Sequence, residues 1–366
     1  MAKMPFNLPK LPPLIDYNQL IGKISEAHRA IASLDSLLGA LPNPALLGRT
    51  MQTKEAVESS KIEGTEASLE EVLQYEALAD KKEYTAKQKD IHEVINYRAA
   101  LDLGIKSLEV LPISENLVKK LHATLLKSGR GANKAPGEFR KVQVYIDRAG
   151  ADITEASYIP PTANEIVPLF SNLEKYLNSD EEKDKLVQIA VVHYQFEAIH
   201  PFLDGSGRVG RLIISLFLYE KKLLSHPFLY LSEFFEEHRQ DYYELLRGVS
   251  EKRDWISWIK FLLSALSTQA HKAESTGKEI LRLHASYKDK IAEFNSAYAI
   301  NLLDAIFVRP IFTTASLRKY AKIKNVQTFF NLVAKFVAAN ILKDTTPKKR
   351  RNKIYMFTEL IDLLNK

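Results

Sequence analysis

The sequence has 366 residues and contains no cysteine. Disulfide bonds, cysteine nucleophiles and zinc sites built on thiolates are therefore excluded. The chain also lacks any uninterrupted apolar run of about 18 residues, the length that a membrane-spanning helix needs. Residues 1–6 have none of the apolar length of a secretory signal. From these absences we expect a soluble, cytoplasmic protein that does not contact membranes.

Charge is distributed unevenly along the chain. The net charge is +6, but residues 296–366 carry 13 lysines and arginines against four aspartates and glutamates, or +9. The remainder carries 38 against 41, or −3. With 46% hydrophobic and 26% charged residues the chain can bury a sizeable core, and its length suits two or three modules. The basic character thus belongs to a C-terminal module.

The densest group of chemically active side chains lies in residues 200–211, His-Pro-Phe-Leu-Asp-Gly-Ser-Gly-Arg-Val-Gly-Arg. Apolar, helix-like runs precede and follow it, at 186–199 and 212–219. The glycines at 205 and 207 allow backbone N–H groups to approach an anion closely, and the following helix adds its partial positive charge. This stretch therefore predicts a phosphate-binding turn.

The charged side chains of this stretch fit a polyphosphate. Arg208 and Arg211 are three residues apart, so both can lie on one helical face and fork onto phosphate oxygens. Asp204 can hold Mg²⁺, which usually binds one or two carboxylates together with substrate phosphates. His200, at a helix end that Pro201 enforces, is free to act as a base. The alternative is a glycine-rich turn between helices, with a buried histidine and two surface arginines.

The stretch resembles the Fic signature, His-x-Phe-x-Asp/Glu-Gly-Asn-Gly-Arg-x-x-Arg, and departs from it only at Ser206, where the family usually has asparagine. The resemblance implies a protein adenylyltransferase that moves AMP from ATP to a Tyr, Thr or Ser hydroxyl of a target protein, with self-modification as well. It implies His200 as the proton acceptor and Asp204 as the Mg²⁺ ligand. The ATP phosphates would contact Gly205, Ser206, Gly207, Arg208, Val209, Gly210 and Arg211.

Ser206 is the one fixed position of the signature at which this chain differs. Serine keeps a hydrogen-bond donor but is shorter than asparagine and tolerates a positive φ less well. We therefore expect slower chemistry or a different donor. Within the fold, some relatives transfer phosphate or phosphocholine, and some remove AMP instead.

A second motif lies far upstream, at Ser59, Glu63 and Gly64. By itself it predicts a helix C-terminus with Gly64 in the left-handed conformation and an ordinary salt bridge. It also resembles the inhibitory motif of Fic proteins, Ser/Thr-x-x-x-Glu-Gly/Asn. The resemblance implies that Glu63 pairs with Arg211 and so competes with the γ-phosphate of ATP.

Residues 137–161 change from helical to alternating periodicity and predict a β-hairpin. It is either a small structural hairpin or, as the resemblance implies, a flap that positions the target polypeptide by strand addition. The flap residues would be Val142, Gln143, Val144, Tyr145 and Ile146. By the same resemblance Tyr242 and Tyr243 contact the nucleotide base, although the preceding pair here is His238-Arg239 where the family commonly has Asn-Arg.

Apolar residues at helical spacing predict a mainly α protein, a Fic helical bundle with the flap. We expect an N-terminal helical region over 1–110, the catalytic core over 111–265 and a linker helix region over 266–298. Residues 299–366 resemble a winged helix-turn-helix, with 325–342 as the recognition-like helix. Its basic wing would contact nucleic acid through Lys348, Lys349, Arg350, Arg351 and Lys353.

Two interpretations of the whole chain remain open at this point. One is the adenylyltransferase with ATP as substrate and Mg²⁺ as cofactor. The other is a DNA-binding regulator whose Fic-like domain senses nucleotide with little turnover. A basic loop on a protein-interaction module explains the tail equally well. Relatives with an N-terminal inhibitory motif are commonly homodimers, but no segment of the sequence marks an interface.

Overall fold

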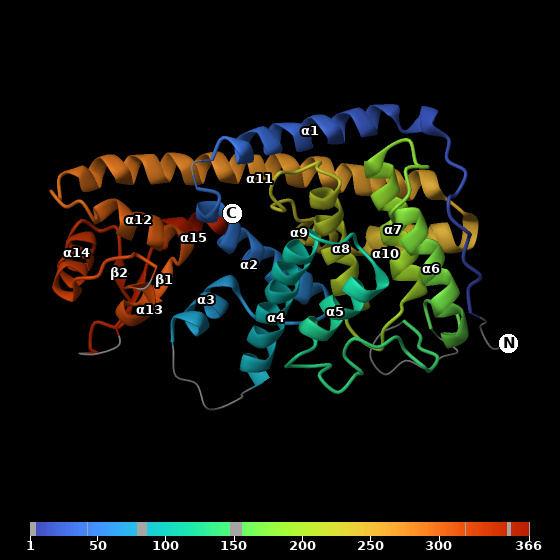
Figure 1. Ribbon diagram of the computed structural model, residues 1–366, viewed down its shortest axis with the longest axis horizontal. Helices are drawn as coiled ribbons and strands as arrows, with labels where there is room; N and C mark the ends of the chain where they lie inside the picture. Colours follow the sequence, from blue (N-terminus) through green and yellow to red (C-terminus); the bar gives the residue numbers. More distant parts are fainter. Residues whose placement is uncertain are drawn as a thin grey trace.

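The computed structural model describes residues 5–41, 43–78, 86–146, 156–318, 320–349 and 353–365. Within them the protein is mainly helical, as predicted, with one small sheet (Figure 1). The helices up to the signature are α1 (Ile21–Gly39), α2 (Ala45–Ile62), α3 (Leu69–Ala77), α4 (Ala86–Ser107), α5 (Glu115–Leu125), α6 (Ile166–Leu177) and α7 (Lys185–Ile199), with short 3-10 turns at Tyr17–Gln19 and Ala163–Glu165. Those that follow it are α8 (Ser206–Glu220), α9 (Ser232–Glu237), α10 (Arg239–Lys252), α11 (Trp255–Ala292), α12 (Ala299–Val308), α13 (Thr314–Arg318), α14 (Val326–Ala338) and α15 (Thr358–Leu364).

The helices α7 and α8 form the centre of the core. Nearly all side chains of α7 are buried, and most of those of α8 as well. A helix that is apolar all round must be covered on every side. Here α6, α10 and α11 pack on α7, and α4 and α5 pack on α8. The turn between α7 and α8, which carries the signature, is therefore held at both ends by a buried helix of the core.

The long helix α11 runs beside α1 along one side of the molecule (Figure 1). Contacts between Glu26 and Ser267 and between Ser33 and Glu274 advance in the same direction along both helices, so the pair is parallel. The linker region expected to begin at residue 266 lies inside this helix, and no break in the backbone marks that boundary. One continuous helix contains both the apolar positions Trp255 and Trp258 and the polar segment after Ser267. The polar half is helical too because it packs on α1 and on the C-terminal segment.

The C-terminal segment contains the sheet, whose strands are β1 (Ile311–Thr313), β2 (Lys343–Asp344) and β3 (Ile354–Met356), all antiparallel in the order β1-β3-β2. Its helix expected over 325–342 ends earlier, at Ala338, and Asn340 turns the chain with φ 55. The segment is docked on the N-terminal helices: α12 packs on α2 and β1 on α3, with a hydrogen bond from Thr313 to the Ala77 carbonyl. The tail and the N-terminal helices therefore share one packed core.

Among the described residues, no helix combines the length and apolar character that crossing a bilayer requires.

The N-terminus of α7 gives a test of how firmly the signature is held. The Asp184 carboxylate caps α7 by accepting from the amides of Leu186 and Val187, and it also lies 2.7 Å from His28 Nε2 on α1. We expect Asp184→Ala to lower the free energy of unfolding by about 1–2 kcal/mol, the cost of losing a good N-cap. The measurement is chemical denaturation.

The loss should depend on pH in a defined direction. The Asp184 hydrogen bond raises the pKa of His28. The stabilisation from the Asp184–His28 pair is therefore complete below about pH 6.5, the ordinary pKa of histidine, and is lost as the pH rises through the raised pKa. The destabilisation should therefore be larger at pH 6 than at pH 8.5. Asp180→Ala is the control, because its exposed carboxylate pairs only with Lys185. An equal loss in both variants would contradict the assignment.

Candidate functional site

The signature turn is built on two left-handed residues. His200 ends α7 with φ 47, and Gly205 precedes α8 with φ 80. The first hydrogen bond within α8 runs from the Val209 amide to the Gly205 carbonyl at 3.0 Å. The amides of Ser206, Gly207 and Arg208 come before it and so have no acceptor within the helix. As predicted, a helix N-terminus follows directly after the histidine and the aspartate.

The concern over Ser206 is wrong in one respect. The positive φ in this turn belongs to Gly205, and Ser206 is the first residue of α8. Its buried Oγ accepts from the Phe202 amide at 3.1 Å and thereby closes the loop between the two helices. The serine acts on the backbone of the turn, and the conformation at this position places no penalty on a side chain.

His200 is a neutral imidazole in this site. Desolvation lowers its pKa to about 4, although the nearby Glu63 carboxylate favours the charged form. Among the described residues no well-directed hydrogen bond reaches its buried Nδ1, and the Glu197 backbone carbonyl lies near the ring. At neutral pH the ring can therefore accept a proton.

Arg211 lies inside the protein, with 3% of its surface exposed. Its Nε donates to Ser59 Oγ at 2.8 Å, and its Nη2 donates both to the Ser59 carbonyl and to Glu63 Oε1, each at 2.8 Å. The structure thus brings Ser59 and Glu63, at the end of α2, onto the last arginine of the signature. Gly64 follows with φ 85, the left-handed residue expected at that helix end.

The Glu63 carboxylate covers the N-terminus of α8. A methyl group placed on Gly207 would come within 2.6 Å of Glu63 Oε1 and 3.1 Å of Arg211 Nη1. Desolvation alone raises the pKa of Glu63, but the charge and hydrogen bond of Arg211, then Arg208 and His200, outweigh it and hold the pKa below its usual value. A carboxylate anion therefore occupies the region where the amides of α8 favour negative charge.

Arg208 has carboxylate partners separate from those of Arg211, although both arginines lie on α8 as their spacing predicted. Its Nη2 donates to Asp204 Oδ1 at 2.9 Å and its Nη1 to Glu93 Oε2 at 3.3 Å, so the two guanidinium groups have separate partners. Each arginine is drawn to the carboxylates on its own side of α8, because both are buried and need compensation. They are on one helix, but each completes a different ion pair.

Asp204 suits Mg²⁺ in the presence of phosphates. Its side chain is 33% exposed, and Arg208 occupies only Oδ1. Among the described residues no group of three or more histidines and carboxylates could hold a metal by itself. A single carboxylate together with phosphate oxygens is the usual Mg²⁺ arrangement in nucleotide sites, so the donor set fits a metal that arrives with its nucleotide.

His122 belongs to the frame of the turn. It accepts from the Gly137 amide through Nδ1 and therefore donates through Nε2 to the Asp204 carbonyl, both at 2.8 Å, and its ring stacks on Phe202. Burial lowers its pKa to about 4, which keeps this tautomer neutral. It is a packed histidine, as expected from its place on an apolar stripe.

The predicted flap is present without regular strands in the described residues. One antiparallel bridge joins Ile146 to Tyr158, and residues 147–155 lie outside the described part of the chain. The remaining flap residues are not in a ladder: Val142 and Tyr145 are more than two-fifths exposed, and Gln143 donates to the carbonyls of Val144 and Pro160. The carbonyls of Val142 and Val144 accept from side chains, and among the described residues only Ile146 of this segment is in a bridge.

Arg140 joins this flap to the catalytic turn. The buried guanidinium donates to the carbonyls of His200 (2.9 Å), Val142 (3.1 Å) and Pro161 (2.5 Å), and its amide donates to the Pro201 carbonyl. Arg140 lies within the segment predicted as a hairpin, but its role in holding His200 left no signal in the sequence.

Three of the predicted nucleotide contacts, Val209, Gly210 and Tyr242, lie beneath the surface of the site. Val209 is buried and its amide is used within α8, while Gly210 lies against Glu197. Tyr242 is buried in an aromatic cluster with its hydroxyl 2.9 Å from His193 Nε2, so it supports the site from behind. Tyr243 is the exposed member of the pair, at 42%.

The prediction missed a carboxylate, Glu93 on α4. It is 1% exposed and accepts hydrogen bonds from Thr65, Arg130 and Arg208. Apolar periodicity cannot distinguish such a buried carboxylate from the solvated charged residues of α4. The loop that contains its partner Arg130 is distant in the sequence and gives no sign of the contact. Three segments far apart in the sequence meet at this side chain.

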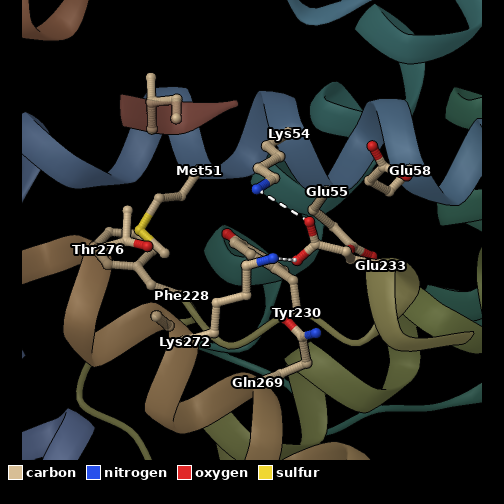
Figure 2. Close-up of a pocket in the computed structure, with 12 residues that line it drawn as sticks. Met51, Lys54, Glu55, Glu58, Phe228, Tyr230, Glu233, Gln269, Lys272 and Thr276 are labelled. Carbon is tan, nitrogen blue, oxygen red and sulfur yellow. Dashed lines mark ion pairs between the residues drawn. The ribbon is translucent and has the colours of Figure 1, made fainter. Parts of the chain in front are cut away.

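A separate pocket on another side of α2 contains contacts that hold this helix against its neighbours (Figure 2). Lys54 of α2 and Lys272 of α11 both pair with Glu233 of α9, at 3.1 and 3.0 Å. Deeper in, burial raises the pKa of Glu55 to about 7, and the carboxyl group accepts from Tyr97 and Ser232. These contacts hold α2 against α9 and α4. The end of α2 that carries Ser59 and Glu63 therefore has a defined position.

The basic wing is described only in part. Lys348 and Lys349 are exposed, Lys353 pairs with Asp344 at 2.7 Å, and Arg350 and Arg351 lie outside the described residues. The free positive charge on the described part of the wing is therefore smaller than the sequence suggested.

The conformation of Gly205 yields a second prediction. A Cβ atom there would lie 3.3 Å from Leu125 and would require a strained φ of 80. We expect Gly205→Ala to lower the free energy of unfolding by about 1 kcal/mol or more, because alanine is strained where φ is positive. Gly248→Ala, within α10 and with no atom in reach of its Cβ, should instead stabilise by up to about 1 kcal/mol. Denaturation of both variants measures the difference, and a neutral Gly205→Ala would contradict it.

Comparison with known proteins agrees with this geometry. The description "Fic/DOC family N-terminal" matches residues 21–106, and "Fic/DOC family" matches residues 112–218, together more than half of the chain. Proteins named protein adenylyltransferase Fic are similar to parts of it. The one from Culex quinquefasciatus is 30% identical over 128 residues (34% of this chain, 22% of the relative), and that from Drosophila willistoni is 27% identical over 249 residues (64% and 45%). The chain thus spans less than half the length of these relatives.

Solved structures show the same fold. A Fic family protein from Desulfovibrio desulfuricans G20 superposes with a TM-score of 0.60 at 23% identity, over 94% of this chain and 98% of that one. A signaling protein with a Fic domain from Bacteroides thetaiotaomicron gives 0.54 at 17% identity, over 71% and 97%. With the histidine, the helix N-terminus and both arginines in place, the chain belongs to the Fic/DOC family.

Proposed function

We propose that this protein is an adenylyltransferase that moves AMP from ATP to a hydroxyl group of a target protein, and that its own Glu63 inhibits the transfer. The observation that carries the proposal is the Glu63 carboxylate at the N-terminus of α8, paired with Arg211 and beside neutral His200. An internal anion lies where an anionic phosphate would bind. The curated relatives named protein adenylyltransferase Fic supply the nature of the transferred group.

Each residue has a definite task in this proposal. The acceptor hydroxyl attacks the α-phosphorus of ATP, its proton passes to His200, and the bond to the β-phosphate oxygen breaks to release pyrophosphate. The three amides at the start of α8 and the guanidinium of Arg211 stabilise the charge that develops on the leaving group. Mg²⁺, held by Asp204 together with the phosphates, would neutralise their charge when bound. In this proposal the target lies along residues 142–146 and pairs by strand addition, replacing the side-chain hydrogen bonds that the Val142 and Val144 carbonyls accept in its absence.

Inhibition follows from competition for one guanidinium. Arg211 already has Ser59 and Glu63 as partners, so a γ-phosphate must displace the carboxylate to reach it. At neutral pH the lowered pKa of Glu63 keeps that carboxylate charged, so it remains a competitor for Arg211. Because Ser59 holds Arg211 independently of Glu63, removal of the carboxylate should leave the arginine in position.

The proposal predicts that Glu63→Gly increases label transfer from α-labelled ATP, including self-modification, by about tenfold or more, the factor that corresponds to ~1.4 kcal/mol of lost competition. His200→Ala in the same background should abolish transfer because no other base is in place. The control is Glu66→Gly, the same change three residues on, where the side chain is exposed and forms no ion pair among the described residues. Absence of label with both the unaltered protein and Glu63→Gly would refute the enzyme.

Nucleic-acid binding by the C-terminal segment is a second candidate function. One side of α14 is uncovered at the far end of the molecule from α6 and α7: Val326 is 45% exposed, Phe330 is 47% exposed, and Gln327 and Asn331 lie beside them (Figure 1). The segment has the order helix, strand, two helices and two strands that a winged helix-turn-helix requires. Amide and apolar side chains on one exposed helix can contact base edges in a major groove.

This candidate predicts weak binding to duplex DNA at low salt, measured by fluorescence anisotropy. Lys348→Gln with Lys349→Gln should reduce the slope of log affinity against log salt by about two, one for each lost phosphate contact. Lys353→Gln should change it less, because that ammonium group is already paired with Asp344. If binding is undetectable at low salt, the candidate fails and the transferase proposal is unaffected.

A further inference from the structure

Glu93 has an unusual set of partners for a buried carboxylate. Oε1 accepts from the backbone amide of Arg130 at 3.0 Å and from its Nε at 2.9 Å. Oε2 accepts from Thr65 Oγ1 at 3.0 Å and from Arg208 Nη1 and Arg130 Nη2, each at 3.3 Å. Five donors from three segments converge on it, while only 1% of its surface is exposed. Such a group fixes the orientation of whatever donates to it.

The donor that matters for the site is Arg208. Its guanidinium lies between two carboxylates, with Glu93 on one edge and Asp204 on the other. Asp204 is also the carboxylate that fits Mg²⁺, and an arginine paired with it competes with a cation for the same oxygens. A second carboxylate on the far edge of the guanidinium shares its positive charge and weakens that competition.

Gly131 shows how close this arrangement is to Asp204. The loop that carries Arg130 continues into Gly131, where a Cβ atom would come within 2.8 Å of Asp204 Oδ2. The loop therefore forms a wall beside the second oxygen of Asp204. Glu93 holds this loop through both the backbone and the side chain of Arg130, so it controls two sides of the aspartate.

We infer that Glu93 is a positioning residue of the proposed transfer reaction: it holds Arg208 and the loop at residue 131 so that Asp204 stays available to the metal and the phosphates. The inference rests on the proposed function and deepens it. Thr65, two residues beyond Glu63, donates to the same carboxylate. The chain after Glu63 is thus anchored, and Glu63 can leave Arg211 by a local movement about Gly64.

The test compares Glu93→Gln with a matched control, both in the Glu63→Gly background. Glu76→Gln is the control, because Glu76 also lies between two arginines, Arg49 and Arg98, but has no contact with the signature. We expect Glu93→Gln to raise the Mg²⁺ concentration for half-maximal transfer, and to lower kcat, by about 10- to 100-fold, the range for a lost partner of a metal ligand. Excess Mg²⁺ should recover part of the rate, and Glu76→Gln should change neither quantity.

A second readout does not depend on turnover. Mn²⁺ bound with a non-hydrolysable ATP analogue, followed by electron paramagnetic resonance, should bind correspondingly more weakly to Glu93→Gln and normally to Glu76→Gln. Glu93→Asp retains the charge at shorter reach and should lie between the two. If Glu93→Gln does not fold, Glu93→Asp carries the test with the same expected direction.

The outcomes separate the two proposals. If Glu63→Gly transfers AMP and Glu93→Gln matches it in rate and Mg²⁺ dependence, the role of Glu93 is refuted and the enzyme stands. If both glutamine variants lose activity in proportion to their stability, Glu93 is only structural. If Glu63→Gly itself transfers nothing, the proposed function fails, and unchanged Mn²⁺ binding in Glu93→Gln would then overturn the positioning role as well.

Discussion

The contact of Arg211 with Ser59 and Glu63 is the interaction on which the site depends. A guanidinium group with 3% exposure cannot remain in an apolar helix without compensation, since an unpaired buried charge is among the most costly features that a fold can contain. Compensation comes from the end of α2, so α2 and the signature helix require one another. The hydrogen bonds of Arg211 are thereby well satisfied, and under the proposed function an incoming phosphate would have to replace what Glu63 provides.

The same need for compensation divides the two arginines of the signature. Arg211 is paired with the N-terminal region through α2, and Arg208 is paired with α4 and with the turn itself through Glu93 and Asp204. Each face of α8 is therefore connected to a different part of the chain. A ligand that bridged the two arginines would replace contacts of both at once. It would therefore alter the packing of α2 and α4 as well as that of α8.

The comparison between sequence and structure separates two kinds of information. Spacing within a short stretch was sufficient for the turn between α7 and α8 and for the α8 N-terminus, because these depend on neighbours in the chain. A family motif supplied the distant pair of Glu63 and Arg211. Glu93 and Arg140 escaped prediction because their role exists only after distant segments meet. The separate carboxylate partners of Arg208 and Arg211 escaped prediction for the same reason, because helical spacing does not reveal charges on distant segments.

Helix α11 has a consequence for any molecule that contacts both ends of the protein. Its 38 residues span about 57 Å without a break, and the tail at its end is also pressed onto α2 and α3. The exposed side of α14 and the histidine of the signature are therefore held at a set separation and angle. Under the proposed function, a target that also contacted the tail would reach His200 only if its own dimensions matched that separation.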